Sequence, residues 1–210
     1  MSVEPLPIAV LISGSGSNLQ ALIDFSSDAF RIAVVISDRE GVRGLERAVE
    51  AGIPTVVVTP DSREGRDGIT EAICDAASGY GATALVLAGF MRVLGAYAIE
   101  RFPLAIINVH PSLLPSFPGA RAVEQALEHG VKLTGVTVHF VDEEVDHGPI
   151  ITQRAVPVYE TDDVASLHAR IQHVEHSVLA DVVDRFARGA LGVSGRIVRD
   201  TVSHATEDGR

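Results

Sequence analysis

The chain has 210 residues, of which 46% are hydrophobic and 21% are charged, a composition typical of an ordered globular protein. Asp and Glu number 28 against 17 Lys and Arg, and the formal charge of -11 disfavours binding to nucleic acid or to an anionic membrane. The single cysteine, Cys74, excludes an intramolecular disulfide framework and a four-cysteine zinc site. We therefore expect a cytoplasmic protein, because a reducing compartment suits a chain without disulfides.

The first half of the chain alternates short apolar runs with longer segments of helical period, as strands connected by helices do. The apolar runs are rich in Val, Ile and Leu without interruption, which is typical of parallel strands buried on both faces. We predict strands over residues 8–12, 32–36, 55–58, 84–88 and 105–109. We predict helices over residues 18–25, 44–51, 64–77 and 95–101.

The pattern changes after residue 110. A proline-rich loop, HPSLLPSFPG, precedes a predicted short helix over 122–128, strands over 134–141 and 150–158, and a long amphipathic helix over 163–188. The polar residues from about 201 are expected to fray. Together these elements predict one α/β domain over residues 1–210, with an open, twisted, mostly parallel sheet, helices on both faces and an antiparallel part from the later strands.

The segment LISGSGSNLQAL places Gly14 and Gly16 between the first strand and the first helix. Exposed amides and the positive end of a helix favour an anion there, so we predict a phosphate site. The dinucleotide fingerprint is incomplete, because Leu19 stands where its third glycine belongs, and no Lys-Ser/Thr pair follows to form a P-loop. A tight turn in which Ser17 or Asn18 caps the helix is the alternative.

Asp38 ends the second predicted strand, about where an acid binds the ribose of a nicotinamide nucleotide. A nicotinamide-dependent oxidoreductase therefore stays open as an alternative function. A phosphate-binding module without catalysis, which would use the glycine-rich turn alone, stays open as well.

A further feature combines one amide, one imidazole and one carboxylate. Asn108 and His110 lie two residues apart at the carboxyl end of a strand, where their side chains share a face and where open α/β sheets keep their sites. Asp146 lies in the loop VDEEVDHGPI, whose Gly-Pro bend can turn it inward. There it would raise the pKa of His110, and the amide and imidazolium would form an oxyanion site for acyl or formyl transfer. Ordinary backbone hydrogen bonds and a solvated acid are the structural alternatives.

No residue in this set is a good nucleophile. Cys74 lies in a predicted helix and is interpreted as a core residue, and no serine occupies a G-x-S-x-G motif. His173 and His176 are only three residues apart and His139 is isolated on a strand, so we predict no metal site. Direct transfer to a bound amine is thus favoured over a covalent enzyme intermediate.

Several segments between residue 8 and about residue 186 carry a resemblance: LISGSGSNLQALID, SDREGVRGLERA, DSRE, LVLAGFMRVL, INVHPSLLPSFPGA, GVTVHFVDEEVDHGPII and QHVEHSV. They resemble the phosphoribosylglycinamide formyltransferases, the folate-dependent enzymes of purine synthesis. The register of Gly135, Asp146 and Gly148 is similar to the pattern of the formyltransferase fold, which is Rossmann-like. Arg121 departs from the family, because bacterial relatives often carry a histidine there, so no role is carried over to it.

The resemblance implies a nucleotide-phosphate half over about residues 1–104 and a folate and catalytic half over about residues 105–200. It implies three catalytic residues: Asn108, His110 and Asp146. The implied contacts to the ribonucleotide are Gly16, Ser17 and Asn18 at its phosphate, with Gln172 and Glu175 from the long helix. The implied folate pocket consists of Met91, Arg92, Val93 and Leu94, with Val141 and Asp142 closing over the pterin and Arg63 as a further contact.

The implied reaction is transfer of the formyl group of 10-formyltetrahydrofolate, as co-substrate, to the amine of glycinamide ribonucleotide in de novo purine synthesis, without a metal. Formyltetrahydrofolate hydrolases and other formyltransferases share parts of the pattern and are the alternatives. The hydrolases carry an amino-terminal regulatory domain, and the methionyl-tRNA formyltransferases continue into a nucleic-acid-binding domain; we expect neither here. The expected partners are the two small-molecule substrates, and the oligomeric state is open, with a homodimer as one alternative.

Overall fold

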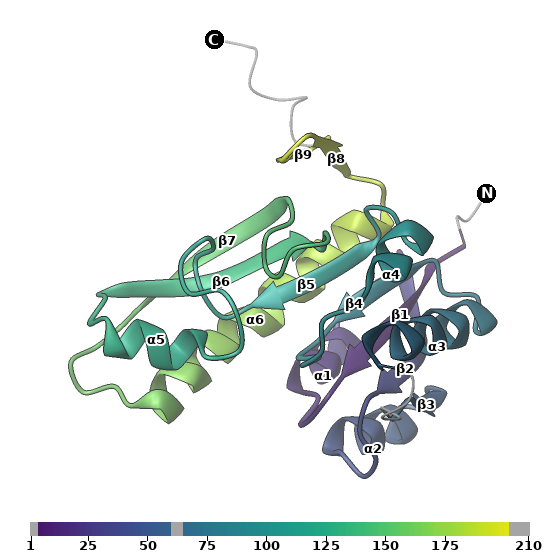
Figure 1. Cartoon of the computed structure of the whole chain (residues 1–210), viewed down its shortest axis with the longest axis horizontal. Helices are drawn as coiled ribbons and strands as arrows, with labels where there is room; N and C mark the ends of the chain where they lie inside the picture. The colour runs from purple at the N-terminus through teal and green to yellow at the C-terminus, as the bar shows by residue number, and fades with distance from the viewer. Residues whose placement is uncertain (1–3, 60–64, 202–210) are drawn as a thin grey trace.

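The described strands form one sheet in the order β3-β2-β1-β4-β5-β6-β7-β9-β8 (Figure 1). The structure, a computed structural model, describes residues 4–59 and 65–201. The strands that pair in parallel in its first half are β1 (Leu6–Ile12), β2 (Phe30–Ser37), β3 (Thr55–Val57), β4 (Ala84–Leu87) and β5 (Ile106–His110). The helices between them are α1 (Ser17–Asp24), α2 (Arg43–Glu50), α3 (Gly65–Gly79) and α4 (Ala96–Arg101).

The second half of the sheet is mainly antiparallel. Its elements are α5 (Ala122–Glu128), β6 (Leu133–Phe140), β7 (Ile150–Pro157) and α6 (Val164–Ala187). A terminal hairpin of β8 (Leu191–Ser194) and β9 (Ile197–Asp200) continues the sheet, and β9 meets β7 in parallel through Ile150 and Ile197. The predicted mixed and mostly parallel sheet is confirmed.

Two hydrophobic cores lie on opposite faces of the sheet, because successive side chains of a strand point to opposite faces. In β1, Ile8, Val10 and Ile12 belong to the core that α1 and α6 cover. Ala9 and Leu11 belong to the core that α3 and α4 cover. All five side chains are fully buried. Figure 1 shows the corresponding layers, with α3 and α4 in front of the sheet and α6 behind it.

The long helix α6 begins with a capping box. The carboxylate of Asp163 accepts from the backbone N–H of Ser166 over 2.8 Å, and the hydroxyl of Ser166 accepts from the backbone N–H of Asp163 over 3.0 Å. Its apolar stripe, from Leu167 to Val183, lies in the core. None of the described helices is both long and apolar enough to cross a membrane.

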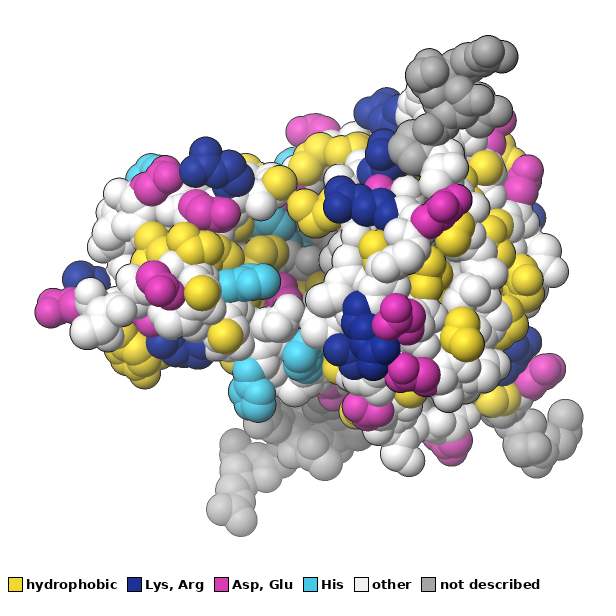
Figure 2. All heavy atoms as spheres, turned by 90° about the horizontal axis from the view of Figure 1, so that it is seen from below, with side chains coloured by type: hydrophobic (Ala, Val, Ile, Leu, Met, Phe, Trp, Pro, Cys, Tyr) yellow, Lys and Arg dark blue, Asp and Glu magenta, His cyan; other side chains and the backbone are white. Residues whose placement is uncertain are grey.

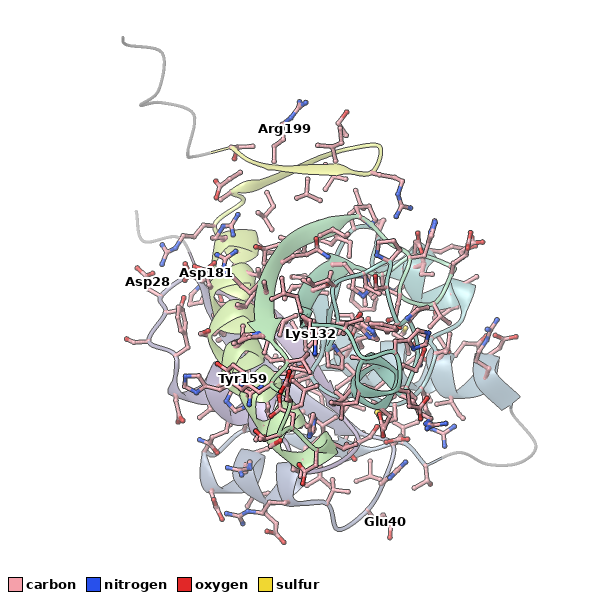
Figure 3. The ribbon with its side chains drawn as sticks, turned by 90° about the vertical axis from the view of Figure 1, so that its left-hand side faces the viewer. Asp28, Glu40, Lys132, Tyr159, Asp181 and Arg199 are labelled. Atoms are coloured by element: carbon pink, nitrogen blue, oxygen red, sulfur yellow. The ribbon has the colours of Figure 1, made fainter. Side chains whose placement is uncertain are left out.

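The predicted strands and helices are present, with boundaries within two residues of those expected. The terminal hairpin was not predicted. Its strands have only four residues each and Ile197 is 57% exposed, so no apolar period reveals them. Figure 3 shows the hairpin at one end of the molecule, where Arg199 points away from the sheet. The tail that was expected to fray lies, apart from residue 201, outside the described residues.

Candidate active site

Asn108 and His110 lie at the carboxyl end of β5, and the loop after β6 brings Asp146 against both. The Nδ1 atom of His110 is 3.3 Å from Oδ2 of Asp146, and Nδ2 of Asn108 donates to Oδ1 of Asp146 over 3.4 Å. The side chains of His110 and Asp146 are only 6% and 10% exposed. The structure therefore brings together the three residues that were expected to be catalytic, and it largely excludes water from His110 and Asp146.

Both ring nitrogens of His110 face hydrogen-bond acceptors. Nδ1 faces the carboxylate of Asp146, and Nε2 lies 2.9 Å from the carbonyl oxygen of Phe117. A neutral imidazole carries one N–H and can satisfy only one of these partners, whereas the imidazolium satisfies both. The contacts of the ring are thus complementary to its protonated form.

Burial opposes that protonated form. It lowers the pKa of His110 below the ordinary value, and it outweighs the raising effects of the Asp146 charge and of the Phe117 carbonyl group. The carboxylate acts in the predicted direction, but desolvation of the ring is larger, so the expectation of a raised pKa is corrected. Burial also raises the pKa of Asp146, yet His139, the N–H of Gly119 and His110 together hold it below its ordinary value, so Asp146 is ionised at neutral pH.

The loop around Asp146 turns its carboxylate inward. Asp146 has a left-handed backbone with a φ of 53°, a conformation that costs a non-glycine residue about 1–2 kcal/mol. Two residues later, a Cβ on Gly148 would collide with the carbonyl group of Phe140, so the bend packs tightly against β6. Oδ2 of Asp146 also accepts from the backbone N–H of Gly119 over 2.8 Å. Asp146 is therefore held by the fold and is not a solvated acid.

His139 on β6 is a fourth member of this group, and the sequence pattern did not assign it. It pairs directly with Asn108 across the β5–β6 junction. Its Nε2 lies 3.2 Å from Nδ2 of Asn108 and 3.7 Å from Oδ1 of Asp146. Its Nδ1 lies 2.7 Å from the carbonyl oxygen of Phe140, so that nitrogen carries an N–H. The two-residue period of β6 was the available signal, but it places His139 here only once the strand pairing is known.

Thr137 fastens the loop after β5 to β6. Its hydroxyl donates to the carbonyl oxygen of Ser112 over 2.7 Å. The same hydroxyl accepts from the backbone N–H of Leu114 and from Nε2 of Gln153, each over 3.0 Å. Thr137 is fully buried, so these bonds fix the course of the loop beside the site.

The start of α1 has no side-chain cap. Gly16 precedes the helix with a left-handed φ of 69°, and no described side chain caps the first turn, so the capping role considered for Ser17 or Asn18 is wrong. Asn18 instead donates from Nδ2 to Oε2 of Glu175 on α6 over 3.2 Å. The uncapped N–H groups keep the positive end of α1 available to an anion.

Asn18 and Glu175 connect two of the segments expected to contact the ribonucleotide. Both side chains are buried, and burial raises the pKa of Glu175 against the lowering effect of Asn18. Oδ1 of Asn18 is buried without a hydrogen-bond partner among the described residues. Gln172, almost one turn before Glu175 on α6, is half-buried. Among the described residues, the Asn18–Glu175 pair thus leaves Oδ1 of Asn18 free to accept a hydrogen bond close to the start of α1.

A hollow of about 470 Å³ opens beside α1. It is lined by Ser17, Gln20, Ala21, Asp24, Arg47, His173, His176 and Ser177. Of the expected ribonucleotide contacts, only Ser17 lines it. Arg47 donates from Nε to the carbonyl oxygen of Ser15 and from Nη1 to Oε1 of Gln20, each over 2.9 Å, so a cation stands beside the helix start. Figure 2 shows histidine side chains around a recess on the face seen from below.

A second hollow of about 470 Å³ lies between α3 and the loop after β4. It is lined by Gly65, Arg66, Ile69, Thr70, Ile73, Phe90, Met91, Arg92, Val93 and Leu94. It therefore includes all four residues expected to line the folate pocket from this loop. Val141 and Asp142 do not line it, although Val141 packs against the same core as Leu94. Arg63 lies outside the described residues.

Two residues with alternative roles are accounted for by the fold. The carboxylate of Asp38 is 1% exposed and accepts from Nε of Arg92 over 2.8 Å, so it is not available to a ribose. Cys74 is buried in α3, and burial raises the pKa of its thiol to about 11, as suits a core residue. Within residues 4–59 and 65–201, no group of three or more His, Cys, Asp or Glu side chains is arranged to hold a metal ion.

The chain is similar to known proteins over most of its length. The sequence model of the formyl transferase family matches residues 6–183. The chain is 45% identical, over 93% of its length, to the trifunctional purine biosynthetic protein adenosine-3 of Bos taurus, and it spans 20% of that relative. It is 41% identical to the phosphoribosylglycinamide formyltransferase of Mycobacterium tuberculosis, over 91% of the chain and 90% of the relative.

Solved structures show the same likeness in three dimensions. Glycinamide ribonucleotide transformylase 1 from Symbiobacterium toebii is 46% identical and superposes with a TM-score of 0.91, over 94% of both chains. The family match covers more than half of the chain, and it includes β5, β6 and the loop that carries Asp146. The chain therefore belongs to the formyl transferase family.

Proposed function

We propose that this chain transfers the formyl group of 10-formyltetrahydrofolate to the amine of glycinamide ribonucleotide in purine synthesis. The observation that carries the proposal is the contact between His110 and Asp146 beside Asn108, at the carboxyl end of β5. Family membership and the names of the related enzymes support the same substrates. The single free cysteine leads us to place the enzyme in the cytoplasm.

The first step needs hydrogen-bond donors at the formyl oxygen. The amine attacks the formyl carbon, a C–N bond forms and the oxygen gains negative charge. The donors are Nε2–H of His110 and Nδ2–H of Asn108. To reach the formyl oxygen, His110 must give up its hydrogen bond to the carbonyl oxygen of Phe117, and Asn108 must give up its 3.4 Å contact with Asp146. Hydrogen bonds to the developing oxyanion are charge-assisted and roughly twice as strong as neutral ones, so both donors stabilise the transition state.

The second step moves a proton and breaks the bond to folate. The attacking nitrogen loses one proton, the N10 nitrogen of folate gains one, and the C–N10 bond breaks. Asp146, ionised and 3.3 Å from the ring, holds His110 in place through both events. Burial lowers the pKa of His110 in the free enzyme. The oxyanion that forms beside the ring has the opposite effect and raises the affinity of His110 for a proton. The imidazolium is therefore stabilised more in the transition state than in the ground state.

The two substrates bind at separate places, the ribonucleotide at the start of α1 and the folate in the hollow beside α3. The phosphate of the ribonucleotide binds at the uncapped start of α1, over residues 16–18, and Gln172 and Glu175 contact the rest of the ribonucleotide from α6. The folate ring enters the hollow lined by residues 91–94, where apolar side chains and backbone groups suit a flat heterocycle. Val141 and Asp142 close over the pterin, and Arg63 adds a contact.

Turnover by the purified chain tests the proposal. With glycinamide ribonucleotide and 10-formyltetrahydrofolate, we expect formylated ribonucleotide and tetrahydrofolate in equal amounts. The double variant Asn108→Ala with His110→Ala should still bind the ribonucleotide but should not transfer the formyl group. Formate release that needs no ribonucleotide would indicate a hydrolase and overturn the proposal, and so would oxidation of NADPH without formyl transfer.

A further inference from the structure

Asp38 forms a buried ion pair that the proposed reaction does not use. It directly follows β2, and its Oδ2 accepts from Nε of Arg92, 54 positions further along the chain, over 2.8 Å. The side chain of Asp38 is 1% exposed and that of Arg92 is 39% exposed. Oδ1 of Asp38 has no hydrogen-bond partner among the described residues, and a second cation, Arg39, stands 4.0 Å from the carboxylate. Arg92 is therefore the main counter-charge of a buried carboxylate.

The same contact helps to fix the loop between β4 and α4, which forms a wall of the hollow beside α3. Two further contacts run from backbone N–H groups of this loop to the hydroxyl groups of Ser13 and Thr70, each over 2.9 Å. Ser13, Thr70 and Asp38 are all buried. Asp38 differs from the other two, because it holds the side chain of Arg92 and not the backbone.

The ion pair leaves most of the Arg92 guanidinium unused. Nε donates to Asp38, whereas the two Nη groups make no hydrogen bond to the described residues, and Arg92 lines the hollow. A guanidinium is planar, so the bond at Nε sets the plane in which both Nη groups lie. Its fork of N–H groups matches the two oxygens of a carboxylate.

We propose that Asp38 is a positioning residue for folate, which holds the guanidinium of Arg92 at the hollow so that its Nη groups meet a carboxylate of the folate tail. The inference rests on the proposed function and specifies which part of folate Asp38 governs. The pterin ring is neutral and needs no counter-charge, whereas the glutamate tail carries carboxylates. Asp38 thus influences folate selection through Arg92 and leaves the ribonucleotide site unchanged.

The experiment compares 10-formyltetrahydrofolate with 10-formyltetrahydropteroate, which lacks the glutamate tail. Asp38→Asn keeps the size of the side chain and an acceptor for Nε, but it removes the charge that orients Arg92. We expect the KM for the formyl folate to rise about tenfold, because a charge-assisted contact is weakened. The KM for the formyl pteroate, the KM for the ribonucleotide and kcat should stay within about twofold, because none of them depends on that contact.

Asp162→Asn is the matched control. Asp162 is also a nearly buried carboxylate, 3% exposed, and it pairs with Arg170 over 2.7 Å, but it lines neither hollow. Loss of this ion pair should change the stability of the protein and not its discrimination between the two formyl donors. If both variants no longer distinguished the two formyl donors, the effect would come from a general loss of rigidity of the protein, and the inference would be overturned.

A double-mutant cycle with Arg92→Ala shows whether Asp38 acts through Arg92. In the Arg92→Ala background, Asp38→Asn should have no further effect on the KM for the formyl folate. The cycle also covers the case in which Asp38→Asn alone does not fold, because the double variant removes both members of the pair. A further rise in this KM in the double variant would overturn the inference.

The outcome is separable from that of the proposed function. Formyl transfer by the wild-type chain tests the function, whereas equilibrium binding of tetrahydrofolate and tetrahydropteroate, followed by fluorescence, tests Asp38 without turnover. Weaker binding of tetrahydrofolate alone in Asp38→Asn supports the inference. Equal weakening of both ligands, or none, overturns it even if the wild-type chain transfers the formyl group.

Discussion

Gly16 and Gly44 meet backbone to backbone where α1 and α2 begin. A Cβ on Gly16 would lie 2.5 Å from Cα of Gly44. A Cβ on Gly44 would collide with Ile12 and lie 3.2 Å from Cα of Gly16. Gly16 also has a φ of 69°, which disfavours any other residue. The glycine-rich turn is therefore required by the packing of two helix starts, in addition to any phosphate that binds there.

Gly16→Ala is expected to lower the free energy of unfolding by about 2–4 kcal/mol, because a left-handed backbone and a close backbone contact both penalise the methyl group. Gly41→Ala is the control, since Gly41 has a φ of 64° but open space around its Cβ position. It should cost only about 1–2 kcal/mol. Urea unfolding of both variants measures the difference, and equal losses would contradict the packing role of Gly16.

Asp146→Asn is expected to reduce kcat by about 10²–10⁴-fold with little change in ribonucleotide affinity, because it removes the charge that stabilises the His110 imidazolium. His110→Ala should be at least as harmful, and the double variant should be clearly less than additive. Single-turnover rates across pH provide the measurement. Glu144→Gln, an exposed acid of the same loop, is the control and should leave the rate unchanged. Independent, multiplicative effects of the Asp146 and His110 variants would exclude their action as a unit.

The imidazole of His110 should titrate below the ordinary pKa of about 6.5 in the free enzyme, because burial is the dominant effect on it. Asp146→Asn should lower this pKa further, because the raising effect of the carboxylate is lost. The pKa of His110 is lower in the folded than in the unfolded chain, so its contribution to stability is present above the unfolded value and is lost as pH falls through the folded value. NMR titration of both proteins tests this, and an upward shift in the variant would refute it.

Glu175→Gln should stabilise the protein at pH 7, because burial raises the pKa of Glu175 and makes its carboxylate costly in the fold. A raised pKa contributes stability below the unfolded value, and that contribution is lost as pH rises through the folded value. We expect a gain in stability at pH 7 and a smaller gain near pH 4. The KM for the ribonucleotide should rise. Thermal unfolding at both pH values is the measurement, with the exposed Glu71→Gln as control; a loss of stability at pH 7 would argue against this account.

Features that depend on local pattern were predictable from the sequence. The apolar run of β1 indicated a strand buried on both faces, and the two-residue spacing of Asn108 and His110 placed both side chains at one strand end. The Gly-Pro bend indicated that Asp146 turns inward, as it does.

Features that depend on distant partners were not predictable. His139 joins the group only through its pairing with Asn108 on the neighbouring strand. Asp38 suggested a ribose contact from its position at the end of a strand. Its actual partner, Arg92, is 54 positions away, and nothing in the local sequence connects the two residues. The pKa of His110 has the same origin, since burial by the whole fold outweighs the one neighbour that the motif revealed.

The β5–β6 junction constrains how this chain can change its length during evolution. Asn108 faces His139 and His110 faces Thr137, so the proposed catalytic residues and the residue that fastens their loop share one register. A deletion in β6 that shifts its pairing with β5 by one residue would turn both His139 and Thr137 toward the opposite face of the sheet. Insertions and deletions can therefore accumulate in the surface turns, whereas β6 must keep its length for the site to assemble.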